Sequence, residues 1–217
     1  MTKLLALLLA LAFSATALLE VAKPGLTPAT ARAGEAEKTA IEAPVFAVDD
    51  SWEYQRADGS RDVTRIVELL PDGGSVTIRD SEPKTRFVKD KHLVNRKIEG
   101  EFSGDPRRYM GWQFIDFPMA PGKKFSYSVK GSIAPFEMEV RGVKWENITV
   151  PAGAFEALKI DVCYYNVTSR WRGCGQTHWY APQAKAFIKR RTPAGWAQAL
   201  LATDFELVRF TLASPSK

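Results

Sequence analysis

The sequence predicts an all-β protein: a single antiparallel β-barrel or half-barrel, preceded by a signal peptide and a disordered linker. Three observations predict this fold. Short segments that alternate apolar and polar residues recur along the chain, turns rich in Pro, Gly and Asp separate them, and helical periodicity is scarce. Because the chain has 217 residues, less a leader, we expect one domain with a substantial core.

The first residues have the pattern of an export signal. A positive head ending at Lys3 precedes an unbroken apolar stretch at 4–13, and small residues follow. We expect a signal peptide at 1–31, with cleavage after Ala17 as the alternative. The apolar stretch is also nearly long enough for a membrane anchor, which is the competing interpretation. No cysteine directly follows it, which excludes the lipid-modified N-terminal Cys of a bacterial lipoprotein. Cleavage leaves a periplasmic or secreted protein without a stable membrane span.

A linker is expected between the leader and the folded domain. The stretch from Lys23 to Val45 is mostly Ala, Pro, Thr, Glu and Lys, and it lacks an apolar period. Such a composition offers too little hydrophobic burial to offset the entropy of ordering the backbone. Residues 32–45 are therefore predicted to be a disordered linker. The β-domain is predicted to span 46–213, so that the folded part of the chain begins near Phe46.

Eleven segments of the domain have strand patterns. Strong turns at Ala57–Ser60 and Pro71–Gly74 separate the first of them. A bulge is expected at Arg141–Gly142, and the alternation of apolar residues changes phase once between Leu207 and Val208, which also predicts a bulge. Residues 197–202 are the best helical candidate, but the flanking alternation favours a strand. The predicted strands are 51–55, 63–70, 75–79, 85–98, 112–117, 124–130, 136–150, 155–167, 170–180, 184–191 and 196–212.

The two cysteines are predicted to form a disulfide. Cys163 and Cys174 flank a segment that turns at Thr168–Ser169. If these two residues form the hairpin tip, residues whose numbers add to 337 face each other, and the cysteines are such a pair. An exported chain meets an oxidising compartment, where a disulfide persists.

A redox or metal site is the alternative for the cysteines. Redox pairs normally use Cys-x-x-Cys at the start of a helix, which is absent here. His178 follows Cys174 on the same strand face, but two cysteines, His178 and the distant His92 make no recognised ligand spacing. No metal and no cofactor are expected.

Residues that would contact a ligand or a surface lie mainly in the second half of the chain. His178 lies in a strand with aromatic neighbours that would line a cavity, although a hydrogen-bonded structural histidine is the plainer interpretation. Basic residues of the strand at 184–191 are expected to share one face, which would suit an acidic lipid headgroup or glycan but is also typical of an exposed sheet face. The candidates are Trp171, His178, Trp179, Tyr180, Lys185, Lys189 and Arg191.

Several segments resemble a known group of proteins. They are Ser51–Tyr54, Pro118–Phe125, Val150–Ile160 and Trp179–Pro182. In this order they are similar to exported bacterial β-proteins known mostly as domains of unknown function, whose form is like that of lipoprotein-carrier and lipocalin-like barrels. The resemblance covers most of 46–212. Members of the group often have a Gly soon after Trp-Tyr-x-Pro, whereas this chain has none at 183–186, which predicts an altered turn. The resemblance implies a fold and no activity.

Together these features predict a non-catalytic exported protein. The formal net charge is +5, without long basic runs, and nucleic acid is not an expected partner of an exported chain. No nucleophile elbow, phosphate loop or zinc-protease helix is present. We expect the protein to bind an apolar or amphiphilic ligand, a lipid or another envelope component. The alternatives are a structural or partner-binding module with a filled barrel, and an uncharacterised hydrolase that uses His178.

Overall fold

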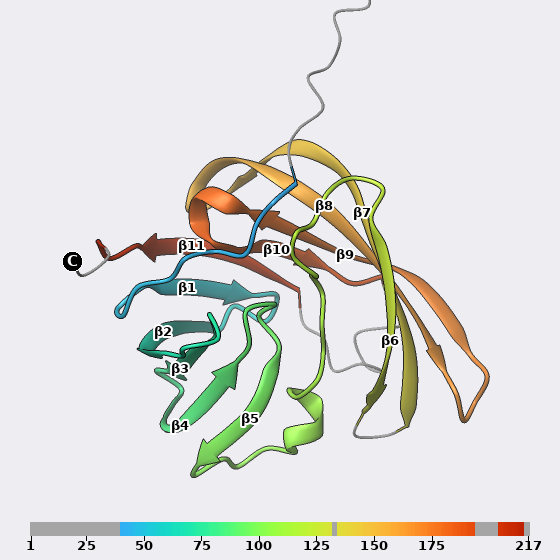
Figure 1. Cartoon of the computed structure of the whole chain (residues 1–217), viewed down its shortest axis with the longest axis horizontal. Coiled ribbons are helices and arrows are strands. Elements are labelled where there is room, and N and C mark those ends of the chain that lie inside the picture. Colours follow the sequence, from blue (N-terminus) through green and yellow to red (C-terminus); the bar gives the residue numbers. More distant parts are fainter. Residues whose placement is uncertain (1–39, 132–133, 194–203, 215–217) are drawn as a thin grey trace, which may run out of the picture. The chain divides into compact units, whose positions relative to one another are not determined.

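Eleven strands form one antiparallel sheet, in the order β5-β4-β3-β2-β1-β11-β10-β9-β8-β7-β6 (Figure 1). The computed structural model describes residues 40–131, 134–193 and 204–214, which belong to one compact unit of the chain. Two short 3-10 helices are present, η1 (Pro106–Arg108) and η2 (Pro182–Ala184). The strands are β1 (Ser51–Arg56), β2 (Arg61–Leu69), β3 (Ser75–Arg79), β4 (Glu82–Lys89), β5 (Asn95–Gly100), β6 (Lys124–Lys130), β7 (Pro135–Val150), β8 (Gly153–Asn166), β9 (Arg172–Ala181), β10 (Ala186–Arg191) and β11 (Phe205–Thr211).

The sheet is curved and open (Figure 1). Strands β5 and β6 are its two edges, and within the described ranges neither edge pairs with a further strand. The prediction of a single antiparallel all-β domain, a barrel or half-barrel, is confirmed, and of its two forms the sheet is not the closed barrel. The strand predicted at 112–117, which would have lain between the two edges in sequence, does not form.

Residues 101–123, which we call the crossing segment, connect the two edge strands across one face of the sheet (Figure 1). Its apolar side chains Ile115, Phe117 and Met119 are buried in the larger of two hydrophobic clusters, together with residues of β6 to β9. Burial against the core, rather than strand pairing, therefore explains the apolar pattern that predicted a strand here. Met119 also exchanges two backbone hydrogen bonds with Ile41.

A second prediction was wrong at 85–98, where one strand was expected and a hairpin of β4 and β5 is found. The turn begins at Asp90, whose carboxylate accepts hydrogen bonds from the backbone N–H groups of His92 and Val94. Leu93 adopts a left-handed conformation with φ of 66°. Because leucine and valine around this turn look like strand residues, the pattern of side chains hid the break.

Both predicted bulges are present. In β7 the pairing with β8 shifts between Gly142 and Lys144, and in β11 the pairing with β1 skips Val208. A side chain at position 142 is excluded, because a Cβ there would lie 2.3 Å from the backbone oxygen of Ala120 in the crossing segment. The glycine therefore lets the crossing segment lie directly on the bent strand.

Two hydrophobic clusters form the core. The larger contains buried residues of β6 to β9 with the crossing segment, and the smaller joins β1, β2, β10 and β11 to the ends of β7 and β8. In β8 the alternation predicts the faces correctly. Leu158, Ile160 and Val162 are fully buried, whereas Lys159 and Asp161 are partly exposed.

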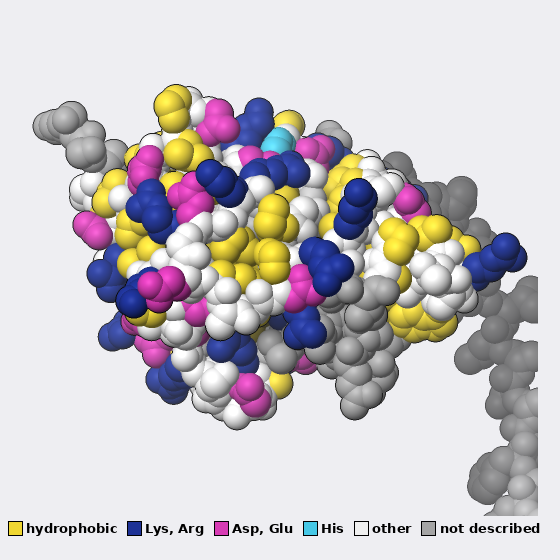
Figure 2. Space-filling model, turned by 90° about the horizontal axis from the view of Figure 1, so that it is seen from below, with side chains coloured by type: hydrophobic (Ala, Val, Ile, Leu, Met, Phe, Trp, Pro, Cys, Tyr) yellow, Lys and Arg dark blue, Asp and Glu magenta, His cyan; other side chains and the backbone are white. Residues whose placement is uncertain are grey.

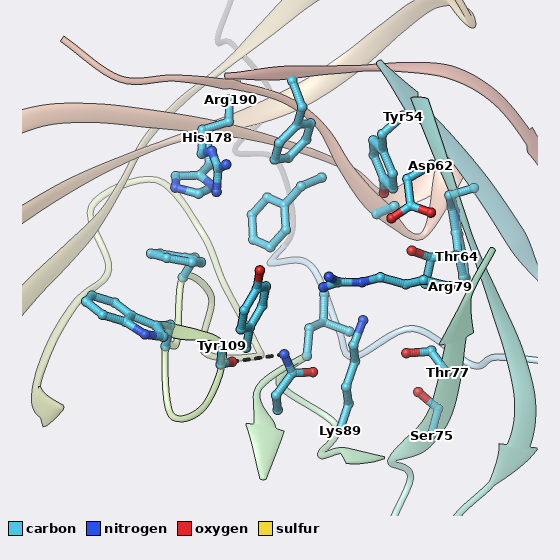
Figure 3. Close-up of a pocket in the computed structure, with 18 of the residues that line it drawn as sticks. Tyr54, Asp62, Thr64, Ser75, Thr77, Arg79, Lys89, Tyr109, His178 and Arg190 are labelled. Carbon is cyan, nitrogen blue, oxygen red and sulfur yellow. Dashed lines mark hydrogen bonds between the residues drawn. The ribbon is translucent and has the colours of Figure 1, made fainter. Parts of the chain in front are cut away.

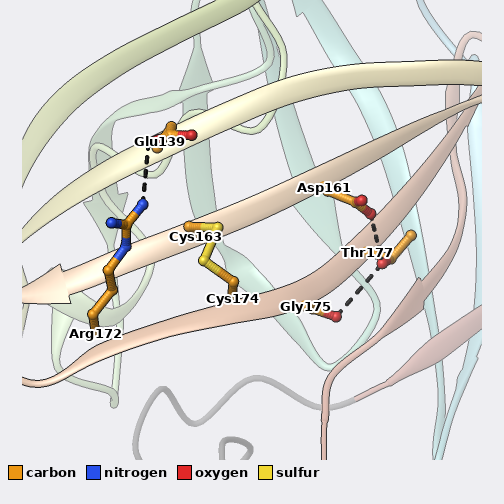
Figure 4. The surroundings of a disulfide bond; sticks show 7 residues. All are labelled: Glu139, Asp161, Cys163, Arg172, Cys174, Gly175 and Thr177. Carbon is orange, nitrogen blue, oxygen red and sulfur yellow. Dashed lines mark hydrogen bonds and ion pairs between the residues drawn. A yellow bond between two sulfur atoms is a disulfide. The ribbon is translucent and has the colours of Figure 1, made fainter.

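The predicted disulfide is present between Cys163 on β8 and Cys174 on β9 (Figure 4). The two residues are paired directly across the hairpin, with Cα atoms 4.1 Å apart. One residue beyond Cys174 the register shifts, and Val162 pairs with Gln176. The ion pair of Arg172 with Glu139 supports the same end of the hairpin. A disulfide is typical of an extracytoplasmic protein.

The signal peptide predicted at 1–31 and most of the linker predicted at 32–45 lie outside the described residues. The structure describes this stretch from residue 40 on, and Ile41 there is buried and paired with Met119. The ordered domain therefore begins before Phe46. Among the residues that are described, none of the helices is long and apolar enough to cross a membrane.

Candidate functional site

A cavity of about 750 Å³ lies between the strands β1 to β5, the strands β9 to β11 and the crossing segment. Its size is within the range of about 300 to 1,000 Å³ that is typical of small-molecule sites. Alternation along the strands builds the wall, because every second residue of a strand faces the same side. Thus Tyr54 and Arg56 come from β1, and Ser75, Thr77 and Arg79 from β3.

One side of the cavity is polar (Figure 3). Ser75, Thr77 and Arg79 line it from β3, and Asp62 and Thr64 line it from β2. The side chains of Ser75 and Thr77 are only 2% and 3% exposed. Within the described ranges neither hydroxyl makes a hydrogen bond, and neither oxygen is among the fully buried polar atoms that lack a partner, so both hydroxyls are accessible from the cavity.

Arg79 is held between two aromatic rings. Its guanidinium carbon lies 4.3 Å from the ring centre of Phe87 and 5.2 Å from that of Tyr109. Its nearest carboxylate is that of Glu82, with the closest nitrogen and oxygen 3.8 Å apart, which is too long for a hydrogen bond. The stacking therefore fixes the guanidinium in place and leaves its N–H groups available.

Lys89, on β4, reaches into the same region from below in Figure 3. Burial, and then the charge of Arg79, lower the pKa of Lys89 from its usual 10.5 to about 8. The amino group is therefore still mostly charged at neutral pH. It has no hydrogen bond and no ion pair with the residues that the structure describes.

The opposite side of the cavity is aromatic. The ring of Phe114 stacks on His178 with centres 4.3 Å apart, and Phe187 lies edge-on at 5.3 Å. The ring centres of Phe205 and Tyr54 are 5.1 Å apart. The cavity is therefore amphipathic, with one side suited to an apolar group and the other to a polar one.

His178 is buried at the aromatic side and is neutral. Burial, and then the positive charge of Arg190, hold its pKa well below 6.5. Its Nε2 lies 3.3 Å from Oε1 of Gln176, whose amide nitrogen reaches Thr192. If Nε2 carries the proton, as this arrangement favours, Nδ1 is an acceptor, and it has no hydrogen-bond partner among the described residues.

Positive charge predominates in the wall. The carboxylates are Asp62 and Glu82, and the cations are Arg56, Arg79, Lys89, Arg108, Lys185 and Arg190. Arg56 is paired with Asp62, at 3.0 Å, and Lys185 is paired at 3.0 Å with Asp50, which is completely buried outside the cavity. On the surface shown in Figure 2, by contrast, cationic and acidic side chains are interspersed around apolar ones.

Asp50 connects three separate parts of the chain next to the cavity. Its carboxylate accepts hydrogen bonds from the backbone N–H groups of Ala47 and Ala213 and from the Lys185 amino group. Lys185 itself has a left-handed conformation with φ of 52°, directly after η2. The turn after Pro182 therefore contains a lysine in a backbone conformation that favours glycine.

The structure separates the sequence-predicted contact residues. His178 and Lys185 line the cavity, and Tyr180 is buried in the larger cluster against Phe117. Trp171 is 40% exposed at the end of the β8–β9 hairpin. Lys185, which directly precedes β10, lines the cavity with Arg190, and it does not share a face with Lys189 and Arg191 as predicted. Those not in the cavity wall are Trp171, Trp179, Tyr180, Lys189 and Arg191.

Trp179, Lys189 and Arg191 form a separate group. The Lys189 amino group lies 5.9 Å from the ring centre of Trp179, and both Lys189 and Arg191 pair with Glu206. The indole N–H of Trp179 donates to Glu146. Carboxylates compensate the charges of Lys189 and Arg191 and accept the hydrogen bond of Trp179. The three residues therefore resemble a cross-strand network on a sheet surface.

Sequence reasoning missed Arg79, Lys89, Tyr109 and Arg190 as cavity residues. Period-two alternation with Ser75 and Thr77 would have placed Arg79 on their face, but nothing indicated that this face was covered. Burial lowers the pKa of Arg190 to about 10, and Asp204 partly offsets this effect. Among the described residues no group of three or more His, Cys, Asp and Glu side chains is placed to hold a metal ion.

Comparisons with known proteins give similarities of structure only. No protein-family model matches the chain, and no curated protein matches it by sequence at a significant level. The structure is similar to the hypothetical lipoprotein YmcC from Escherichia coli, with a TM-score of 0.45, 11% identity, and coverage of 81% of this chain and 92% of that chain.

Two further solved structures are similar. A "putative lipoprotein" from Parabacteroides distasonis has a TM-score of 0.40 and 13% identity, over 80% of this chain and 100% of that chain. A "putative exported protein" with a YmcC-like fold from Bacteroides fragilis has a TM-score of 0.37 and 16% identity, over the same shares of the two chains.

Proposed function

We propose that this protein is exported and acts without catalysis, holding one small amphiphilic ligand inside its curved sheet. The observation that carries the proposal is the cavity of about 750 Å³ with one aromatic side and one polar side. Solidly packed domains lack voids of this size, because protein interiors are packed as densely as organic crystals. The filled-barrel alternative therefore has less support.

A hydrolase that uses His178 also has less support. A general base needs a partner that stabilises its charged form, commonly a carboxylate. The partner of His178 is the amide of Gln176, and the nearest charge with an effect on its pKa is the cation of Arg190. Both features favour the neutral imidazole as a part of the cavity wall.

The proposal is tested by binding of a neutral amphiphilic probe, N-phenyl-1-naphthylamine, whose fluorescence rises in an apolar site. We expect saturable binding to the purified protein. Thr64 faces the cavity from β2, whereas its neighbour Val63 faces the opposite side of the strand. Thr64→Trp should fill part of the cavity and abolish probe binding, and Val63→Trp is the matched control, which should leave it intact.

Urea unfolding of both variants establishes that they are folded. If a folded Thr64→Trp protein binds the probe as well as the unmodified protein does, the cavity is not the binding site. If the unmodified protein does not bind the probe, and native mass spectrometry of protein purified from its own envelope finds no small molecule, the proposal is refuted.

A further inference from the structure

We propose that Arg79 and Lys89 bind the anionic headgroup, a carboxylate or a phosphate, of a single-chain amphiphile whose apolar part lies against the aromatic side of the cavity. This inference rests on the binding function proposed above. It specifies that the ligand carries a negative charge, and it specifies which end of the ligand lies at which side of the cavity.

The first support is the charge that the wall leaves uncompensated. Arg56 and Lys185 each have a carboxylate within 3.0 Å, but Arg79 has only the distant contact with Glu82 and Lys89 has none in the described ranges. An isolated charge inside a protein is unfavourable unless it is paired. An anion beside Lys89 and Arg79 would supply the pairing that the protein itself does not.

The second support is the set of hydrogen-bond donors at this place. Arg79 is oriented by Phe87 and Tyr109, and its guanidinium makes no hydrogen bond within the described part of the chain. Ser75 and Thr77 are residues that are more than nine-tenths buried, and their hydroxyls point into the cavity on the same side (Figure 3). Convergent N–H and O–H donors around a fixed guanidinium are typical of carboxylate and phosphate sites.

The third support is the position of the aromatic rings. Phe114 and Phe187 surround His178, at the side of the cavity from which β9 and β10 come. Figure 3 places His178 and Arg79 on different sides of the cavity. A ligand that satisfies both therefore needs a charged end and an apolar end, which describes an amphiphile better than a free anion.

The experiment compares ligands that share a chain and differ in headgroup. Dodecanoate, dodecyl phosphate, dodecanol and dodecyltrimethylammonium, each below its micelle concentration, displace the naphthylamine probe from the purified protein. We expect the two anions to bind at least tenfold more tightly than dodecanol, and the cation to bind more weakly. Acetate and inorganic phosphate test whether the headgroup alone suffices, and we expect them not to compete at the same concentrations.

Variants at position 89 test whether Lys89 causes the preference for anionic headgroups. Lys89→Met keeps the length of the side chain and removes its charge, so the anions should lose about tenfold to hundredfold in affinity, as for a lost charge-assisted hydrogen bond, while dodecanol binds as before. Lys91→Met is the matched control, because Lys91 is exposed in the β4–β5 turn. Lys89→Arg should restore the preference in part.

The outcomes separate the two proposals. Equal binding of anions and dodecanol, or a preference that survives in both Lys89→Met and Arg79→Gln, would overturn the headgroup site and leave the binding function standing. Competition by inorganic phosphate as strong as that by dodecyl phosphate would refute an amphiphile as the ligand. If no dodecyl compound displaces the probe from a protein that binds it, the headgroup site is likewise refuted.

Discussion

Lys89→Met is expected to make the ligand-free protein more stable at neutral pH. In the folded protein burial and the charge of Arg79 lower the pKa of Lys89 from 10.5 to about 8, whereas an unfolded chain has the usual value. At pH 7 both states are mostly charged, and the folded state carries the cost of an unfavourable charge. Methionine fills nearly the same volume without this cost.

The magnitude follows from the two pKa values. At about 1.36 kcal/mol per pKa unit, the difference between 10.5 and about 8 corresponds to roughly 3 kcal/mol. Because Lys89 is only partly buried, solvent screens part of this cost, and we expect a gain of about 2 kcal/mol in the free energy of unfolding. The sign also fixes the pH dependence. As the pH rises from 8 to 10.5 the folded unmodified protein releases the proton that the unfolded chain retains, so its stability rises and the advantage of the variant disappears.

Urea unfolding of the unmodified protein, Lys89→Met and Lys91→Met at pH 7 and pH 10.5 measures this effect. The variant should be more stable at pH 7, nearly equal at pH 10.5, and weaker in binding dodecanoate at pH 7. A loss of stability in Lys89→Met at pH 7, or a gain that does not change with pH, would refute the claim that the lysine is an uncompensated buried charge. A stabilising substitution that impairs binding is the usual sign of a functional residue.

Three further predictions concern other parts of the domain. Replacing Cys163 and Cys174 together by alanine should lower the free energy of unfolding by about 2 to 3 kcal/mol, and an unchanged urea midpoint would contradict a stabilising role. Asp50→Asn should cost about 3 kcal/mol, because it removes the partner of Lys185 from a fully buried site; a loss below 1 kcal/mol would show that the pair is dispensable. Because the pKa of His178 lies well below 6.5, the folded state resists its protonation, so stability falls as the pH decreases through 6.5, and the slope approaches about 1.4 kcal/mol per pH unit roughly one unit below that value. His178→Phe should remove this part of the loss between pH 7 and pH 5, and equal losses in both proteins would argue against it.

Most of the sheet was predictable from local patterns. The limits of β3 and β6 match the predicted strands, and the alternation in β8 indicates its buried face correctly, because one side of each strand is dry and the other is wet. The disulfide was also predictable, since the hairpin tip alone determines which residues face each other. These features depend on neighbours in sequence.

The cavity was not predictable in the same way. Its wall combines residues of β1 to β5 with residues of β9 to β11, and no local pattern states which strands face one another across a curved sheet. The turn at Asp90 was hidden by Leu93 and Val94, so Lys89 was not recognised as the last residue of a strand. Residues 112–117 of the crossing segment were predicted as a strand because burial against another layer and burial within a sheet select the same apolar residues.

β1 and β11 are neighbours in the sheet although they lie at opposite ends of the domain sequence. Every other pair of neighbouring strands is consecutive in the chain, so the sheet is an eleven-stranded meander whose continuous path has been cut between β11 and β1 and rejoined from β5 to β6. A circular permutant that starts within residues 101–123 and links the two terminal strands would restore that meander and shorten the sequence separation of its longest pairing, a change that usually speeds folding. The natural connectivity does not have this short separation. In its place, the segment at 101–123 is attached to both edge strands and covers the cavity face of the sheet, which an uninterrupted meander would leave uncovered.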